Sequence, residues 1–194
     1  MPKKEPLYLI HQHHATHLHY DFRLEIDGVL KSWALKELPL KPSHPVMAIQ
    51  VADHSIKYGS FEGIIPPFHY GAGPVIIWDQ GTFTHFTIDY SQRTLSLEQA
   101  EKQGYIAFSI HAKKLHGSYL LLRITKKQKW LLIKLYDDHV LKGRKPSSWN
   151  KSVISGKTLE QIFNAQSKIT YQKWLSTGAN IRYKKQKQYN LLGN

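Results

Sequence analysis

The sequence contains no cysteine and no hydrophobic run of membrane-spanning length. Without cysteine, a disulfide scaffold, a thiolate zinc site and a cysteine nucleophile are all excluded. The longest apolar runs, such as residues 75–78, are far shorter than the about 20 residues that a membrane-spanning helix needs. The first residues also lack the apolar core of a signal peptide. We therefore expect a soluble, cytoplasmic protein that has no membrane partner and is not exported.

Acidic side chains are scarce. The 194 residues include 14 Asp and Glu against 27 Lys and Arg, which gives a formal net charge of +13. A surface this basic attracts polyanions, because binding releases the counterions condensed on their phosphates. Nucleic acid is therefore the expected partner, although some ribosome-associated and membrane-surface proteins are equally basic. Residues 138–194 hold 11 basic and only 2 acidic side chains, so much of the excess charge lies near the C-terminus.

Short apolar-alternating segments fill the first two thirds of the chain. The clearest is residues 18–35, where two alternating runs flank Asp27-Gly28, a dipeptide that tolerates the positive φ angles of a tight hairpin turn. The other predicted strands are residues 7–10, 47–51, 74–78, 82–88, 105–111, 118–124 and 130–136. Strands this short and closely spaced, with almost no helical periodicity between them, predict an antiparallel barrel or sandwich.

The composition changes after Asp137 toward Lys, Ser, Asn and Gln, with glycine and proline interspersed. This change predicts a β domain over residues 1–137 and a basic C-terminal extension over residues 138–194. A linker is expected between about residues 138 and 155. The extension therefore begins where the strand-like segments end.

Two short helices are expected within the C-terminal extension. Thr158 and Gln161 have the spacing of a capping box, which predicts a helix through about Gln166. Residues 169–175 predict a second short helix, whereas the basic run at residues 182–188 is expected to be mobile.

Four polar side chains share one face of the first hairpin strand. Alternation places His19, Asp21, Arg23 and Glu25 opposite the apolar side chains of that strand. Imidazole and carboxylate are good ligands for manganese, iron or zinc, and His13 can supply a third ligand. Arg23 is suited to hold a phosphate oxygen beside the metal, although it can equally pair with Glu25 or another carboxylate. The row predicts a metal site in the lumen or on a concave face of the barrel, with a solvated His-rich loop as the alternative.

Several motifs together resemble the 3′-phosphoesterase domain of bacterial DNA ligase D. The longest is residues 13–34, which contains the polar row. The later motifs follow in the family's order: Asp53-His54 with Tyr58, Phe61-Glu62-Gly63, Ile65-Pro66, Tyr70-Gly71-Ala72-Gly73, Trp78-Asp79 and residues 130–134. The similarity extends over about residues 9–137, across many separated motifs.

This resemblance implies a small β-barrel that holds one manganese ion through two histidines and an aspartate. The matching residues for the metal are His13, His19 and Asp21, and those for the substrate phosphate and catalysis are Arg23, His54 and Tyr58. Members of the family remove a 3′-terminal ribonucleotide to leave a 3′-phosphate, and then hydrolyse that phosphate to a 3′-hydroxyl during break repair. The resemblance therefore implies DNA or DNA/RNA 3′ ends, such as those of a primer-template, as substrates.

The chain also departs from the family at several positions. His11 stands where the family has glutamine, residues 36–38 replace Pro-Lys-Gly, and Val46 replaces an arginine. Residues 67–69 replace Glu-Gly-Gln, and the N-terminal arm is short. Glu37 takes the place of a lysine that helps the phosphatase step. The resemblance thus implies intact metal binding, whereas the departures affect residues expected to serve the second reaction, hydrolysis of the 3′-phosphate.

Two other functions are compatible with these residues. The Glu37 and Val46 positions allow a catalytically impaired module that binds nucleic-acid ends. Two histidines and a carboxylate on a barrel also describe a metal oxygenase or isomerase, although Arg23 and the basic charge disfavour it. The chain is expected to be a freestanding domain, with a separate DNA ligase or end-binding protein as its partner.

Overall fold

A β-hairpin with a two-residue turn lies in the N-terminal half of the fold. The computed structural model describes residues 5–125, 128–139 and 148–177. In it, β2 (Leu18–Ile26) and β3 (Val29–Leu35) pair in antiparallel register through Asp27 and Gly28. These two residues have φ angles of +51° and +71°, which the tight turn requires and which asparagine, aspartate and glycine adopt most readily. The predicted hairpin is therefore confirmed.

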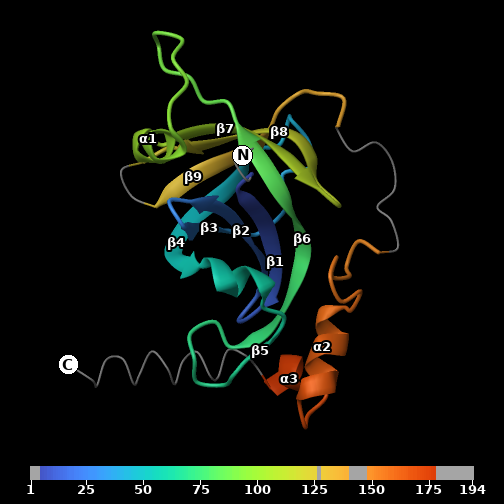
Figure 1. Ribbon diagram of the computed structural model, residues 1–194. Coiled ribbons are helices and arrows are strands. Elements are labelled where there is room, and N and C mark those ends of the chain that lie inside the picture. The colour runs from blue at the N-terminus through green and yellow to red at the C-terminus, as the bar shows by residue number, and fades with distance from the viewer. Residues whose placement is uncertain (1–4, 126–127, 140–147, 178–194) are drawn as a thin grey trace, which may run out of the picture.

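Eight antiparallel strands of the described chain close into a barrel (Figure 1). Neighbouring strands pair in the order β1-β2-β3-β4-β9-β8-β7-β6, and pairing between β6 and β1 closes the ring. The remaining strands are β1 (Leu7–His14), β4 (Val46–Ser55), β5 (Gly63–Ile65), β6 (Gly73–His85), β7 (Tyr105–Ala112), β8 (His116–Arg123) and β9 (Lys129–Lys134), with β5 added at the edge of β6. The predicted antiparallel barrel is confirmed, and the sandwich alternative is not.

Large aromatic side chains fill the interior of the barrel. Trp33 and Trp130 meet edge to face with ring centroids 5.6 Å apart, and Phe22 lies 5.9 Å from Phe108. All four side chains are fully buried. Burying each one stabilises the fold by roughly 1.5–3 kcal/mol. The lumen is therefore a packed core, which excludes it as one of the two predicted places for the metal site.

One long strand, β6, replaces the two strands predicted at residues 74–78 and 82–88. It pairs with β1 along its first part and with β7 along its second part. Gly81 lies where the two pairings overlap, opposite both Tyr8 and Ala112. A Cβ atom at this position would approach the carbonyl oxygen of His111 to 2.1 Å, so only glycine fits. The glycine between the predicted strands marks close packing and not a turn.

The structure also contains a helix that strand periodicity did not indicate. Helix α1 (Leu97–Gln103) precedes β7 and begins with a capping box in which Ser96 and Gln99 bond reciprocally. It ends at Gly104, whose φ angle of +78° gives the left-handed C-cap that glycine favours. Leu97 and Ala100 turn toward the barrel core. The helix therefore packs its apolar side chains against the barrel core, next to β7.

The C-terminal extension packs on the barrel. Helices α2 (Leu159–Gln166) and α3 (Tyr171–Thr177) lie where two short helices were expected. Phe163 and Trp174 pack against Ile76 of β6, and Trp149 packs edge to face on Trp78 at 4.8 Å. The division of the chain at residue 137 stays a prediction, and the basic run at residues 182–188 lies outside the described residues. In the described part of the chain, no helix is long and apolar enough to cross a membrane.

Candidate metal and phosphate site

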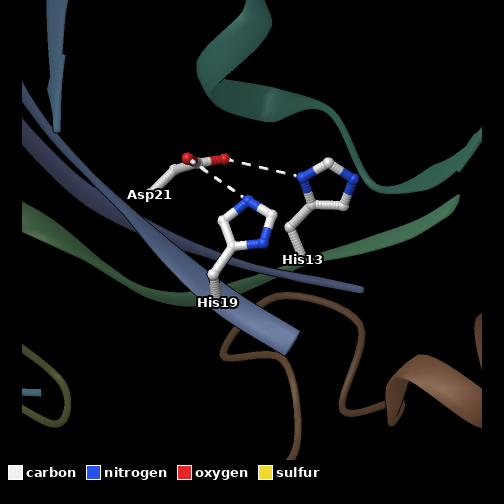
Figure 2. Close-up of side chains that lie close together, drawn as sticks. All are labelled: His13, His19 and Asp21. Atoms are coloured by element: carbon white, nitrogen blue, oxygen red, sulfur yellow. Dashed lines mark ion pairs between the residues drawn. The ribbon is translucent and has the colours of Figure 1, made fainter. Parts of the chain in front are cut away.

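Pairing between β1 and β2 brings the three predicted metal ligands together. His13 lies directly opposite His19 across the two strands, and their ring centroids are 4.7 Å apart. Asp21 follows His19 by two residues and so shares its face of β2. Figure 2 shows both imidazoles directed at the Asp21 carboxylate. The metal-ligating atoms of the three residues all lie within 4.8 Å of one another.

Backbone carbonyl groups fix the tautomer of both histidines. His13 Nε2 lies 2.7 Å from the carbonyl oxygen of Gly71, and His19 Nδ1 lies 2.9 Å from that of His17. Because a carbonyl oxygen only accepts, these two nitrogens must carry the hydrogens. The lone pairs therefore lie on His13 Nδ1 and His19 Nε2, which are 3.8 and 3.7 Å from the oxygens of Asp21.

This donor set fits a divalent transition metal. Histidines that bind a metal commonly donate their second ring nitrogen to a carbonyl group, which orients the lone pair toward the ion. Gly71 is well suited to this task, because its φ angle is +74° and a Cβ atom there would lie 3.2 Å from His13 Cε1. His13, His19 and Asp21 thus offer two neutral nitrogens and one oxygen to a single ion.

The surroundings of Asp21 and His19 favour the protonation states that metal binding requires. Burial opposes ionisation of Asp21, but the neighbouring His13 imidazole and the charge of Arg23 outweigh it and hold its pKa well below the usual range. Burial lowers the pKa of His19, with a smaller opposing contribution from Asp21. Near neutral pH, the site therefore presents a carboxylate together with a neutral His19 imidazole.

Arg23 links this cluster to the predicted phosphate-binding residues. Its side chain is only 2% exposed and donates from Nη2 to Asp21 at 3.1 Å. Nη1 donates to Ser32 Oγ at 2.6 Å and to His54 Nδ1 at 2.8 Å, and Nε donates to His11 Nδ1 at 3.2 Å. Arg23 therefore pairs with Asp21, whereas Glu25 accepts from a backbone N–H group of β1.

His54 and Tyr58 complete the group of predicted site residues. His54 lies near the end of β4, and Tyr58 lies in the following 3₁₀ helix η1 (Ile56–Ser60), which contacts β3 and β4. Their rings stack at 4.8 Å, and the Arg23 guanidinium lies 5.2 Å from the centre of the Tyr58 ring. Burial and the charge of Arg23 lower the pKa of His54. All six predicted residues thus lie in one connected network on the outer face of β1 and β2.

Three contributors to this network were not predicted as site residues. Ser32 lies opposite Arg23 in the β2–β3 register, and that register follows from counting outward from the Asp27-Gly28 turn. His11 was noted only as a departure from the family. The Gly71 carbonyl has no signature in the sequence, because only the folded loop brings it to His13.

The departures Glu37 and Val46 lie outside this network. Val46 is buried in the barrel core, and Glu37 is exposed and pairs with His44 at 3.0 Å. Neither Val46 nor Glu37 therefore takes part in the hydrogen bonds that hold Arg23 and the metal cluster.

Comparison with known proteins identifies the family. Residues 11–123 match the family model described as the DNA ligase D 3′-phosphoesterase domain. The multifunctional non-homologous end joining protein LigD of Pseudomonas aeruginosa is 42% identical over 134 residues, which is 67% of this chain and 15% of that protein. The corresponding protein of Mycobacterium tuberculosis is 42% identical over 66% of this chain and 16% of that protein. The protein of Mycolicibacterium smegmatis is 37% identical over 67% of this chain and 17% of that protein. The chain therefore spans about a sixth of the length of these relatives, and it belongs to the DNA ligase D 3′-phosphoesterase domain family.

Proposed function

We propose that this protein is a manganese-dependent 3′-phosphoesterase that removes ribonucleotides and phosphates from the 3′ ends of DNA or DNA/RNA strands. The observation that carries the proposal is the pair of histidine lone pairs directed at Asp21, with Arg23 beside them. Family membership supports the same reaction class. The arginine and the basic charge disfavour a barrel oxygenase or isomerase.

His13, His19 and Asp21 would hold the manganese ion. When bound, manganese supplies a Lewis acid that can take a non-bridging phosphate oxygen and neutralise charge in the transition state. Asp21 reduces the net positive charge of the site, and the two carbonyl groups keep the imidazoles from rotating. Other divalent transition metals suit the same donors.

Arg23 acts mainly by orienting its neighbours. A guanidinium group has five N–H donors, and four of them are used by Asp21, His11, Ser32 and His54. One Nη2 hydrogen remains for a phosphate oxygen. Arg23 therefore contributes a fixed positive charge and at most one direct bond to the substrate, in place of a two-bond clamp.

His54 is best suited to donate a hydrogen bond and not a proton. Its Nδ1 accepts from Arg23, so the hydrogen of the neutral ring lies on Nε2. Protonating Nδ1 would break that bond, and the lowered pKa of His54 also favours the neutral ring. The Nε2–H group can stabilise negative charge on a phosphate oxygen as it develops. Tyr58, stacked on His54, holds the ring in place.

Both reactions of the proposed sequence are phosphoester hydrolyses and can use the same residues. Removal of the terminal ribonucleotide leaves a 3′-phosphate, and hydrolysis of that phosphate leaves the 3′-hydroxyl that a ligase needs. The relatives' names place them in non-homologous end joining. We further propose a DNA ligase activity or an end-binding protein as the partner of this phosphoesterase.

The direct test is a cleavage assay with manganese. Primer-templates ending in a 3′-ribonucleotide or a 3′-phosphate are incubated with the protein, and the products are resolved on a gel. We expect both ends to be converted to a 3′-hydroxyl. Accumulation of the 3′-phosphate would restrict the function to the first reaction, and binding without cleavage would identify an end-binding module.

A substitution at Asp21 tests the metal assignment. Asp21→Asn keeps the size of the side chain but removes its charge, so we expect manganese affinity and both cleavage rates to fall by at least about 100-fold. Manganese binding is measured by electron paramagnetic resonance. Asp53→Asn is the matched control, because Asp53 is exposed and pairs with Lys31. Equal loss in both variants would contradict the assignment.

A further inference from the structure

Two exposed aromatic side chains lie in the loop beside the metal cluster. The loop covers residues 66–72 and joins β5 to β6. Phe68 is 67% exposed and Tyr70 is 81% exposed, so neither contributes to the core. Tyr70 directly precedes Gly71, whose carbonyl oxygen accepts from His13 at 2.7 Å. Tyr70 is thus presented to solvent next to a residue that contacts a proposed metal ligand, and Phe68 lies two residues before Tyr70.

Two backbone hydrogen bonds and one unusual φ angle define the shape of this loop. His69 N donates to the carbonyl oxygen of Pro66 at 3.3 Å, and Ala72 N donates to that of His69 at 3.1 Å, which gives two successive turns. Phe68 has a φ angle of +73°, a conformation that is unfavourable for a bulky side chain. Strain of this kind persists only where surrounding structure imposes it, and it is concentrated at functional sites. The loop therefore has a built shape that keeps Phe68 exposed.

We propose that Phe68 and Tyr70 form a stacking platform for the nucleobases at the 3′ end of the substrate strand. The inference rests on the proposed function, because it takes the phosphate of that end to lie at the metal cluster. Aromatic side chains next to a cationic site bind single-stranded ends by stacking, and every base offers a face to stack on. The platform binds ends without reading their sequence.

A nucleic-acid end accounts for this surface better than a protein partner does. The rings adjoin a site built for phosphate, and each phosphate of a strand is flanked by bases. The net charge of +13 favours a polyanionic ligand. Phe68 and Tyr70 are only two rings of one loop, whereas protein interfaces need a broad buried patch.

Binding measurements with non-cleavable ends test the platform separately from catalysis. Primer-templates ending in a 3′-hydroxyl carry either 2-aminopurine or an abasic residue at the terminal position, and manganese is present. We expect the protein to bind the base-bearing end at least about fivefold more tightly than the abasic end, and to quench 2-aminopurine fluorescence. In the Phe68→Ala/Tyr70→Ala double variant, both the affinity difference and the quenching should be lost.

Three control variants make the result decisive. Tyr90→Ala removes a fully exposed ring from the loop between β6 and α1 (Figure 1), and should keep the affinity difference. Phe68→Tyr and Tyr70→Phe retain the rings and should also keep it. Unchanged quenching and affinity in the double variant would overturn the proposal, as would a change in self-association alone, measured by sedimentation. The protein could bind the base-bearing end more tightly than the abasic end and yet cleave neither the 3′-ribonucleotide nor the 3′-phosphate substrate of the cleavage assay. In that case the platform stands and the proposed function fails.

Discussion

A single buried guanidinium connects the two halves of the candidate site. Removing a charge such as that of Arg23 from water is costly unless a counter-charge and hydrogen-bond acceptors surround it. Asp21 supplies the charge, and His11, Ser32 and His54 supply neutral acceptors. Because each acceptor comes from a different strand, the orientation of Arg23 depends on the register of strands β1 to β4. The site is therefore organised before substrate arrives.

His11 offers a test of this organisation. His11→Phe keeps a flat ring but leaves the Nε–H group of Arg23 without its acceptor in a buried place, so we expect the free energy of unfolding to fall by about 1–3 kcal/mol. His11→Gln supplies a side-chain oxygen in the same region and should lose much less. Denaturant unfolding measures both, and equal stability of the two variants would show that the acceptor does not matter.

Local strand geometry alone predicts only part of the candidate site. Strand alternation places His19, Asp21 and Arg23 on one face, because side chains alternate with a period of two. Alternation cannot tell which face is interior, and the site lies outside the barrel. His54 and Tyr58 follow from the family resemblance alone, since they reach Arg23 through pairing of β3 with β4 and through η1.

At the scale of elements, a buried ion pair lies at the end of β9. Lys134 is only 2% exposed, and its ammonium group lies 2.6 Å from the carboxylate of Asp137. The same carboxylate accepts from the backbone N–H groups of Ser118 in β8 and of His139. Burial opposes ionisation of Asp137, but these bonds outweigh it and lower its pKa. Asp137 thus ties β8 to the chain that follows β9.

Replacing Asp137 should change both stability and its dependence on pH. Asp137→Asn leaves the buried ammonium group without a counter-charge, so we expect a loss of roughly 3 kcal/mol at neutral pH. Because the folded-state pKa is lowered, the stabilisation is present above the unfolded value of about 3.8 and is lost as pH falls through the lower folded value. Below about pH 4 the wild type should therefore lose stability more steeply than the variant.

The control for this prediction is Asp138→Asn, the neighbouring carboxylate, which is exposed. Thermal unfolding followed between pH 2.5 and 7, in steps chosen around the carboxyl pKa of about 4, gives the comparison. Parallel pH curves for the wild type and Asp137→Asn would contradict the assigned role of the pair.

Elements were predictable where one local pattern decides them. The Asp27-Gly28 hairpin and the capping box at Thr158 each depend on a few neighbouring residues, and both are present. Gly81 suggests a turn in the sequence, but the structure requires glycine there because the end of β7 approaches closely. Helix α1 was missed although Ser96 and Gln99 have the same capping-box spacing, because it lies between strand-like segments on both sides.

For the molecule as a whole, the C-terminal extension lies against β1, the strand that carries His13. Tyr171 Oη is 2.6 Å from the Nδ1 atom of His14, the neighbour of His13, and Trp174 packs against the same imidazole. Both aromatic residues lie beyond residue 123, where the family match ends. The extension is therefore part of the scaffold around β1, and residues outside the family match support the end of the strand that carries His13.

The basic run at residues 182–188 leads to a prediction about how nucleic-acid affinity depends on salt concentration. Arg182, Lys184, Lys185 and Lys187 supply four positive charges within six residues. If each neutralises one phosphate of a duplex, replacing all four by glutamine should reduce the slope of log affinity against log salt by about 3–4. Fluorescence anisotropy between about 50 and 200 mM salt measures this slope, within the range where phosphate contacts dominate affinity. A variant with the three lysines changed to arginine preserves the charge and should keep the wild-type slope. An unchanged slope in the glutamine variant would mean that these residues make no phosphate contacts, and that the rest of the basic surface carries the nucleic-acid affinity.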